Sequence, residues 1–277
     1  MKTKRIIRET IITILLCVAA LTTVIPFLYM ISTAFKGQVF VFEVPPQFIP
    51  KNPTLQNFIA AFASNNFGRY FLNSIIVTVI AVLSILLLAS MMAYALARYQ
   101  FVGRKFIYGL VIFFMTMPAM SLIVPQFIVA HTLQLTDTLA GLIVLDVAQN
   151  LPFAVFLLKG FLEDIPKEIE EAAIIDGASP WSIYMHIVVP LCKPALATSA
   201  IIAFLGAWDE FVWASTITNS PQNRTLPVAI ATFQGVHTTN WGLVFAASLI
   251  AIVPVLIMFI SLQKYFVKGM VAGAVKG

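Results

Sequence analysis

The stretch EEAAIIDGASPWSIYMHIVVP, residues 170–190, stands apart from the rest of the chain because it combines acids, a glycine and a Ser-Pro pair. Just before it, Asp164 or Ile165 can cap a helix that Pro166 helps to start, since proline fits the first turn of a helix. Acids crowd the first half of this helix, where the helix dipole favours negative charge. Gly177 is placed to end it in a left-handed conformation. The pattern predicts a short helix followed by a tight turn.

A second helix is predicted directly after the turn, with Ser179 as its cap and Pro180 at its first position. The first helix has an apolar face made of small and branched residues at helical spacing, namely Ile165, Ile169, Ala172 and Ala173. This face suits close approach to another surface. One interpretation is an amphipathic helix on lipid headgroups, but the acids count against it because inner-leaflet lipids are anionic.

The remainder of the chain has the composition of a membrane protein. Its 277 residues are 60% hydrophobic and 10% charged, whereas a soluble domain carries roughly a quarter charged residues. Each long apolar run is long enough to cross a bilayer, which takes about 20 residues. We predict an all-α, polytopic fold with six spans, at 11–35, 71–97, 106–130, 139–158, 194–216 and 242–263.

Basic residues orient these spans. Most of the 17 Lys and Arg residues precede span 1, lie between spans 2 and 3 or between spans 4 and 5, or follow span 6. The positive-inside rule therefore predicts that both termini are cytoplasmic. The net charge of +5 is then a topology signal and needs no nucleic acid. We divide the chain into an N-terminal span with its outer loop, 1–70, and a transmembrane domain, 71–277, with a cytoplasmic loop at 163–190 and a short C-terminal tail.

The chain shows no pattern of an enzyme or a metal site. Cys17 and Cys192 have no recurring spacing, and the histidines at 131, 186 and 237 form no ligand spacing. The phosphate-binding pattern G-x-x-x-x-G-K-[ST] is absent from the sequence. A nucleotide-driven process would therefore take its energy from a partner chain.

The acidic loop carries a recognisable signature. The signature pattern is E-A-A, three residues, G, nine residues, I, one residue, and L-P. This chain matches it with Glu171-Ala172-Ala173, Gly177, Ile187 and Val189-Pro190. The one departure is valine in place of leucine at residue 189. This pattern resembles the signature loop of the permease subunits of binding-protein-dependent ABC importers. The segments RTLPVAIATFQG (224–235) and QKYFVKGMVAGAVKG (263–277) resemble the carbohydrate branch, of the maltose G-subunit type. The resemblance covers essentially the whole chain.

This resemblance implies a type I importer transmembrane domain in the bacterial inner membrane. The loop at 163–190 would be the coupling helix that sits in a groove of an ATPase subunit, through Glu171, Ala172, Ala173, Asp176, Gly177, Ile187 and Pro190. The implied partners are a second homologous permease, two ATPase subunits that bind ATP and Mg, and an extracytoplasmic solute-binding protein. This chain itself would bind no cofactor. Its tail would reach the ATPase dimer interface or be a frayed terminus.

Polar residues within the spans are candidates for a translocation path, because they are costly in a bilayer. Asp146, Gln149 and Asn150 form a stripe on one helical face of span 4. They either offer donors and acceptors to sugar hydroxyls or form an interhelical hydrogen-bond cluster. The resemblance to the maltose type implies that most sugar contacts come from the other permease.

Span 5 carries GAWDEFVWAS, whose Trp208, Asp209 and Glu210 we also place along the candidate path. Asp209 and Glu210 lie about 22–24 Å along a helix from Pro194, near the outer edge of the bilayer. Trp208 and Trp213 fit that depth as interfacial anchors, and a ring face for sugar stacking is the alternative.

Two further features concern span 3 and the last outer loop. Pro118 and Pro125 each remove a backbone hydrogen bond, so span 3 is predicted to kink, either to let the bundle rock or for packing alone. The outer loop at 217–241 holds Gln222, Asn223, Arg224 and Gln234. By resemblance these contact the solute-binding protein, and a loop that is only solvated is the alternative.

The sequence therefore favours the permease of an ATP-driven carbohydrate importer. The same machine with another cargo, such as glycerol-phosphate, a polyol or another small solute, remains an alternative. An ion-driven secondary transporter would need paired ionisable groups in the membrane, and Asp146 has no evident basic partner in a span. A membrane-embedded enzyme is disfavoured because no catalytic constellation is present.

Overall fold

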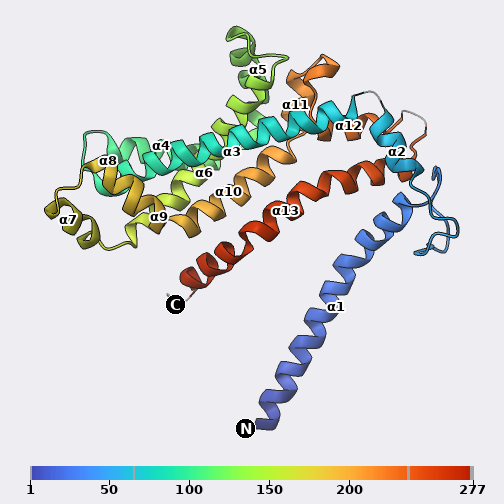
Figure 1. The fold of residues 1–277 in the computed structure, drawn as a ribbon, viewed down its shortest axis with the longest axis horizontal. Helices are drawn as coiled ribbons and strands as arrows, with labels where there is room; N and C mark the ends of the chain where they lie inside the picture. The colour runs from blue at the N-terminus through green and yellow to red at the C-terminus, as the bar shows by residue number, and fades with distance from the viewer. Residues whose placement is uncertain (1, 65, 236–237, 275–277) are drawn as a thin grey trace. The chain divides into compact units, whose positions relative to one another are not determined.

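The computed structural model describes residues 2–64, 66–235 and 238–274, with side chains placed for 6–64, 66–235 and 238–264. His237 and the side chains of the tail from Tyr265 onward lie outside the described residues. The described chain is built from helices, which Figure 1 colours from blue at the N-terminus to red at the C-terminus. It divides into two compact units, residues 1–68 with 229–253 and residues 69–228 with 254–277. The domains predicted from the sequence meet at residue 70 instead, and residues 229–253 are not grouped with the N-terminal part in that prediction.

The first unit contains α1 (Lys2–Ala34), α2 (Gln56–Ala63) and the first half of α13 (Trp241–Ala274). Asn57 of α2 is buried and donates from Nδ2 to the carbonyl oxygens of Ala34 (3.0 Å) and Lys36 (2.5 Å), which ties α2 to the end of α1. Side chains 6–28 of α1 are exposed, as suits an apolar helix that contacts lipid.

The core of the second unit lies between α3 (Phe67–Arg98), α4 (Arg104–Thr116), α6 (Leu139–Glu163) and α10 (Lys193–Trp208). One face of α3 is a fully buried stripe of residues at intervals of four, namely Ala81, Ile85, Ala89 and Ala93. Small residues at such an interface let helix backbones approach closely in a membrane. Alanines of α6 and α10 lie in the same core, at Ala154, Ala200, Ala203 and Ala207.

Five helices are long and apolar enough to cross a membrane, at 6–34, 67–98, 139–163, 193–217 and 241–264, and a bent pair makes the sixth span. This confirms the six predicted spans. The pair consists of α4 and the segment 119–132, which meet at an angle of 102°. That segment contains η1 (Ala119–Leu122) and α5 (Ile123–Thr132).

The bend in the third span lies at the first of its two prolines. Met117 has the extended conformation that a residue before proline favours, so α4 ends at Thr116 and Pro118 precedes η1. The expected kink at Pro118 is therefore a complete break. Pro125 produces no kink because it lies in the first turn of α5, where its missing N–H needs no partner.

Short helices complete the second unit. The loop after α6 forms α7 (Glu168–Ile175), α8 (Pro180–Ile183), the π-helical turn η2 (Tyr184–Val188) and α9 (Val189–Leu191). After α10 come α11 (Val212–Ile217), η3 (Pro221–Asn223) and α12 (Leu226–Thr232), whose last residues belong to the first unit. The predicted helix start near Pro166 is wrong, because α6 continues to Glu163 with Asp164 as its C-cap, and α7 begins only at Glu168.

Candidate functional site

The loop at 163–190, which we call the coupling loop, has the predicted turn. Gly177 has a φ of +81°, in the left-handed region, directly after α7. The Ser179 hydroxyl oxygen accepts a hydrogen bond from Ser182 N at 3.2 Å, and Pro180 is the first residue of α8. The predictions for Gly177, Ser179 and Pro180 are confirmed.

A buried ion pair fixes the coupling loop to the end of α3. Arg98 Nε lies 2.6 Å from Glu170 Oε1, and the two side chains are only 7% and 11% exposed. The Tyr94 hydroxyl donates to the other carboxylate oxygen of Glu170 at 2.9 Å, and an Arg98 nitrogen donates to Ile165 O at 3.0 Å. Sequence reasoning missed Glu170, which stands one residue before the recognised Glu-Ala-Ala motif.

Most of α7 outside this ion pair is exposed, and its exposed surface includes three isoleucines. Ile175 is 86% exposed, and Ile169, Ile174 and Trp181 are exposed beside it in the same loop. Of the residues predicted to contact a partner, Glu171, Ala172, Asp176, Gly177 and Pro190 are exposed, whereas Ala173 and Ile187 are half-buried against the core. The predicted shared face is therefore divided, with Ala173 turned inward and Ile169 outward.

The polar stripe of α6 faces two directions. Asp146 is 4% exposed, and Asn150 donates from Nδ2 to Asp146 O at 2.9 Å. Asn150 also lies against Gly206 of α10, so it packs between the two helices, while its hydrogen bond to Asp146 O stays within α6. Gln149 is exposed and turned away from that contact. Of the three residues, Gln149 alone lines the cavity described next.

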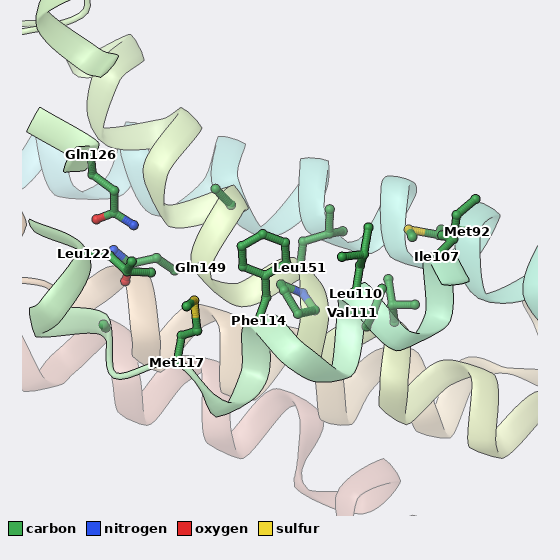
Figure 2. A pocket seen from close by; sticks show the side chains of 14 residues that line it. Met92, Ile107, Leu110, Val111, Phe114, Met117, Leu122, Gln126, Gln149 and Leu151 are labelled. Atoms are coloured by element: carbon green, nitrogen blue, oxygen red, sulfur yellow. The ribbon is translucent and has the colours of Figure 1, made fainter. Parts of the chain in front are cut away.

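A cavity of about 450 Å³ opens between α3, α4, α5 and α6. Its walls are mainly apolar, and Figure 2 shows Gln126 and Gln149 together at one end, with Met92 and Ile107 at the other. A smaller pocket of about 100 Å³ shares Gln126 and Gln149 and adds Glu210 and Trp213. The break at Pro118 lets the segment after it turn and place Gln126 opposite Gln149. Nothing in the sequence pattern distinguishes Gln126 from an ordinary polar residue of a span.

The residues at the end of span 5 have structural partners. Glu210 accepts hydrogen bonds from Trp213 N and Ala214 N, each at 2.7 Å, so its carboxylate caps the N-terminus of α11. Asp209 is exposed at the end of α10.

The two tryptophans of span 5 are packed inside the second unit. Trp208 is 2% exposed and stacks on Phe204 with ring centroids 5.6 Å apart. Trp213 is buried as well. The predicted interfacial anchors are therefore core residues, and Trp208 has no free ring face for a sugar.

The outer segment 218–226 is clamped on one side by Asp137. Asp137 Oδ1 accepts from Asn219 N and Ser220 N, both at 3.0 Å, and Oδ2 accepts from the Ser220 hydroxyl. Asn223 donates from Nδ2 to Asp137 O. The Ser220 hydroxyl is the main cause that holds the pKa of Asp137 below its ordinary value.

On its other side the outer segment is held by α3. Asn73 donates from Nδ2 to Gln222 O (2.8 Å) and Arg224 O (2.9 Å), and Ser74 Oγ accepts from Leu226 N at 2.8 Å. Among the predicted contact residues, the side chains of Asn223 and Arg224 hold the segment itself, and Gln222 is exposed. Gln234 lies in the other unit.

Comparison with known proteins agrees with this architecture. The model of the family "Binding-protein-dependent transport system inner membrane component" matches residues 85–271. A putative ABC transporter permease of Caldicellulosiruptor sp. is 39% identical over 264 residues, 95% of this chain and 96% of its own. The sulfoquinovosyl glycerol transport system permease of Agrobacterium fabrum is 35% identical, over 91% of this chain and 88% of its own.

A solved structure shares the fold. It is a bacterial ABC transporter involved in the import of the acidic polysaccharide alginate, with a TM-score of 0.81 and 24% identity over 94% of this chain and 96% of that one. The family match covers more than half of the chain, and the two relatives cover nearly all of it. The chain therefore belongs to the family of binding-protein-dependent transport system inner membrane components, the non-catalytic, membrane-spanning permease subunits of bacterial ABC transporters.

Proposed function

We propose that the chain is a permease subunit of an ATP-driven importer that moves a carbohydrate from an extracytoplasmic solute-binding protein into the cytoplasm. Its partners in this proposal are a second homologous permease, two ATPase subunits that bind ATP and Mg, and the binding protein. The relatives that handle sulfoquinovosyl glycerol and alginate support a saccharide as cargo. The chain itself binds no cofactor in this scheme.

The observation that carries the proposal is the group of exposed isoleucines on α7, namely Ile169, Ile174 and Ile175. Ile174 and Ile175 are exposed on a helix of eight residues that the ion pair of Glu170 with Arg98 fixes to α3. An exposed apolar patch on a rigid support is typical of a protein contact. The acids Glu168 and Glu171 on the same helix disfavour an anionic lipid surface as the occupant. The partner that the family resemblance implies for this loop is an ATPase subunit, which would bind α7 in a groove.

The cargo proposal rests on the lining of the cavity and the smaller pocket. Gln126 and Gln149 each supply an amide donor and an acceptor, which suits hydroxyl groups. Among the described lining residues none is basic. A phosphate group would favour basic partners, so glycerol-phosphate is the weaker cargo, whereas a polyol shares the chemistry of a sugar.

Disulfide cross-linking tests the coupling-loop contact. Cys17 and Cys192 are first replaced by alanine, and Ile175→Cys is then combined with single cysteines along the groove of the ATPase subunit that copurifies. We expect cross-links at Ile175→Cys that change in yield when ATP is bound. Val44→Cys is the control, because Val44 is as exposed but lies in the loop predicted on the opposite side of the membrane. Absence of cross-links at Ile175→Cys in a complex that hydrolyses ATP contradicts the proposal.

A further inference from the structure

The helix α3 forms hydrogen bonds with a different functional loop at each of its two ends. At its C-terminal end, Tyr94 and Arg98 bond to both carboxylate oxygens of Glu170 in the coupling loop. Arg98 also reaches the backbone of the same loop at Ile165. Because this ion pair is buried, separating it would leave a charge without a partner in a low-dielectric environment, which is strongly unfavourable.

At its N-terminal end, α3 bonds to the outer segment 218–226. The bonds go to backbone groups at Gln222, Arg224 and Leu226, so they fix the path of the segment whatever its side chains are. Arg69 adds a bond from Nε to Gln222 O at 3.1 Å. Asn73 and Ser74 are buried, so water does not compete readily for these bonds.

Between these two ends α3 is an uninterrupted helix. Its 32 residues contain no proline, whereas in the described part of the chain each of the other spans contains a proline or is divided into separate helices; α1, for example, contains Pro26. The third span breaks at Pro118, and the fifth span is divided into α10, which ends at Trp208, and α11, which begins at Val212. The helices α6 and α13 contain Pro152 and Pro254. Asn73 and Arg98 are 25 residues apart along α3, or about 37 Å.

We propose that α3 is a rigid link between the coupling loop and the outer segment, with Glu170, Arg98 and Asn73 as its positioning residues. When the ATPase displaces α7, the bonds of Glu170 make the end of α3 follow. The bonds of Asn73 and Ser74 then carry the outer segment with it. Through the same helix, binding of the solute-binding protein at the outer segment changes the position of α7 and thereby the rate of ATP hydrolysis. This inference rests on the proposed function.

A double-mutant cycle on the assembled transporter tests the link. The transporter, with its partner permease and ATPases, is reconstituted in liposomes, and the readout is ATP hydrolysis with saturating binding protein divided by hydrolysis without it. We expect Asn73→Ala and Glu170→Gln each to lower this ratio about fivefold, as for loss of about 1 kcal/mol of hydrogen bonding. If one link carries the signal, the double variant is no worse than either single variant.

Sites that are so far apart act independently unless an element connects them, and independent losses would multiply to about 25-fold. A multiplied loss in the double variant overturns the inference, and so does an unchanged ratio in either single variant. Thr78→Val is the matched control, because Thr78 is buried on α3 and its hydroxyl has no hydrogen-bond partner among the described residues, in either loop or elsewhere. Its ratio should equal that of the wild type.

Two further measures keep the test decisive. Should Asn73→Ala fail to assemble, Ser74→Ala removes the bond to Leu226 N and enters the cycle in its place. A wild-type transporter whose hydrolysis does not respond to binding protein contradicts the proposed function itself, before any variant is compared. The two failures are therefore distinguishable.

Discussion

The side-chain oxygen of Asn150 in α6 lies 2.6 Å from the point where a Cβ atom on residue 206 of α10 would stand. Residue 206 is glycine, so the Asn150 side chain packs directly against the backbone of α10 at this point. Asn150 is held there by its own bond to Asp146 O. This contact fixes the packing of two of the spans that form the core of the second unit.

Gly206→Ala should therefore destabilise the second unit. A methyl group at this point forces the Asn150 side chain to move and give up its bond to Asp146 O, or the helices to separate. Such overpacking costs about 1–3 kcal/mol, of which the higher helix propensity of alanine returns about 1 kcal/mol. The measurement is the thermal transition of the purified complex in detergent. Gly160→Ala is the control, because a Cβ at that position in α6 meets no neighbouring atom, and it should be neutral or slightly stabilising. The double variant Gly206→Ala/Asn150→Ala should recover part of the loss, and no recovery would contradict the assigned contact.

Gly177→Ala should weaken coupling without creating a clash. A Cβ on residue 177 meets nothing within 4 Å, so the whole effect comes from the φ of +81°, which costs about 1–2 kcal/mol for a residue with a side chain. We expect a lower ratio of stimulated to basal ATP hydrolysis, since α7 loses its defined end. Gly177→Asn should lie between wild type and Gly177→Ala because asparagine tolerates the left-handed region. Equal ratios in all three proteins would show that the turn is not required.

Acidification should release the outer segment. The pKa of Asp137 lies below its ordinary value, chiefly because of the Ser220 hydroxyl, so the folded state prefers the carboxylate. Its stabilisation is present above the ordinary aspartate value of about 4 and is lost as the pH falls through the lowered pKa. Hydrogen exchange of a peptide that contains Asn219 and Ser220, corrected for the intrinsic rate, should show protection at neutral pH and its loss in that acid range. Asp137→Ala should lack the protection at every pH, and a protected peptide in this variant would contradict the clamp.

Cys192 should be a poorly reactive thiol. Burial raises its pKa to about 11, so the reactive thiolate is scarce near neutral pH. In a Cys17→Ala background we expect a water-soluble maleimide to label the folded protein far more slowly than the denatured protein at pH 7.5. Comparable labelling of both forms would show that Cys192 is not in the packed site described.

The sequence predicts this molecule well where the information is local. Span positions follow from apolar runs, and the turn of the coupling loop follows from Gly177, Ser179 and Pro180, because a few neighbouring residues set these structures. The ion pair of Glu170 with Arg98 joins residues 72 positions apart. No spacing rule connects them, since the pair depends on how α3 packs against the loop.

The candidate path shows the same limit. Counting residues from Pro194 gives the depth of Trp208 along its helix but not the direction in which the helix turns its ring, and the ring is buried. Asp146, Gln149 and Asn150 share a helical face by spacing, yet Asn150 packs against α10 while Gln149 lines the cavity. Gln126 joins Gln149 only because the break at Pro118 changes the course of the third span.

Uptake into proteoliposomes tests the central claim most directly. The vesicles contain this chain with its partner permease and ATPase subunits, ATP is enclosed in the lumen, and binding protein loaded with a radiolabelled saccharide is added outside. The account predicts uptake that requires both ATP and binding protein and that ignores an imposed proton or sodium gradient. Uptake that runs on an ion gradient without ATP would contradict it, and the buried Asp146 would then become the candidate for ion coupling.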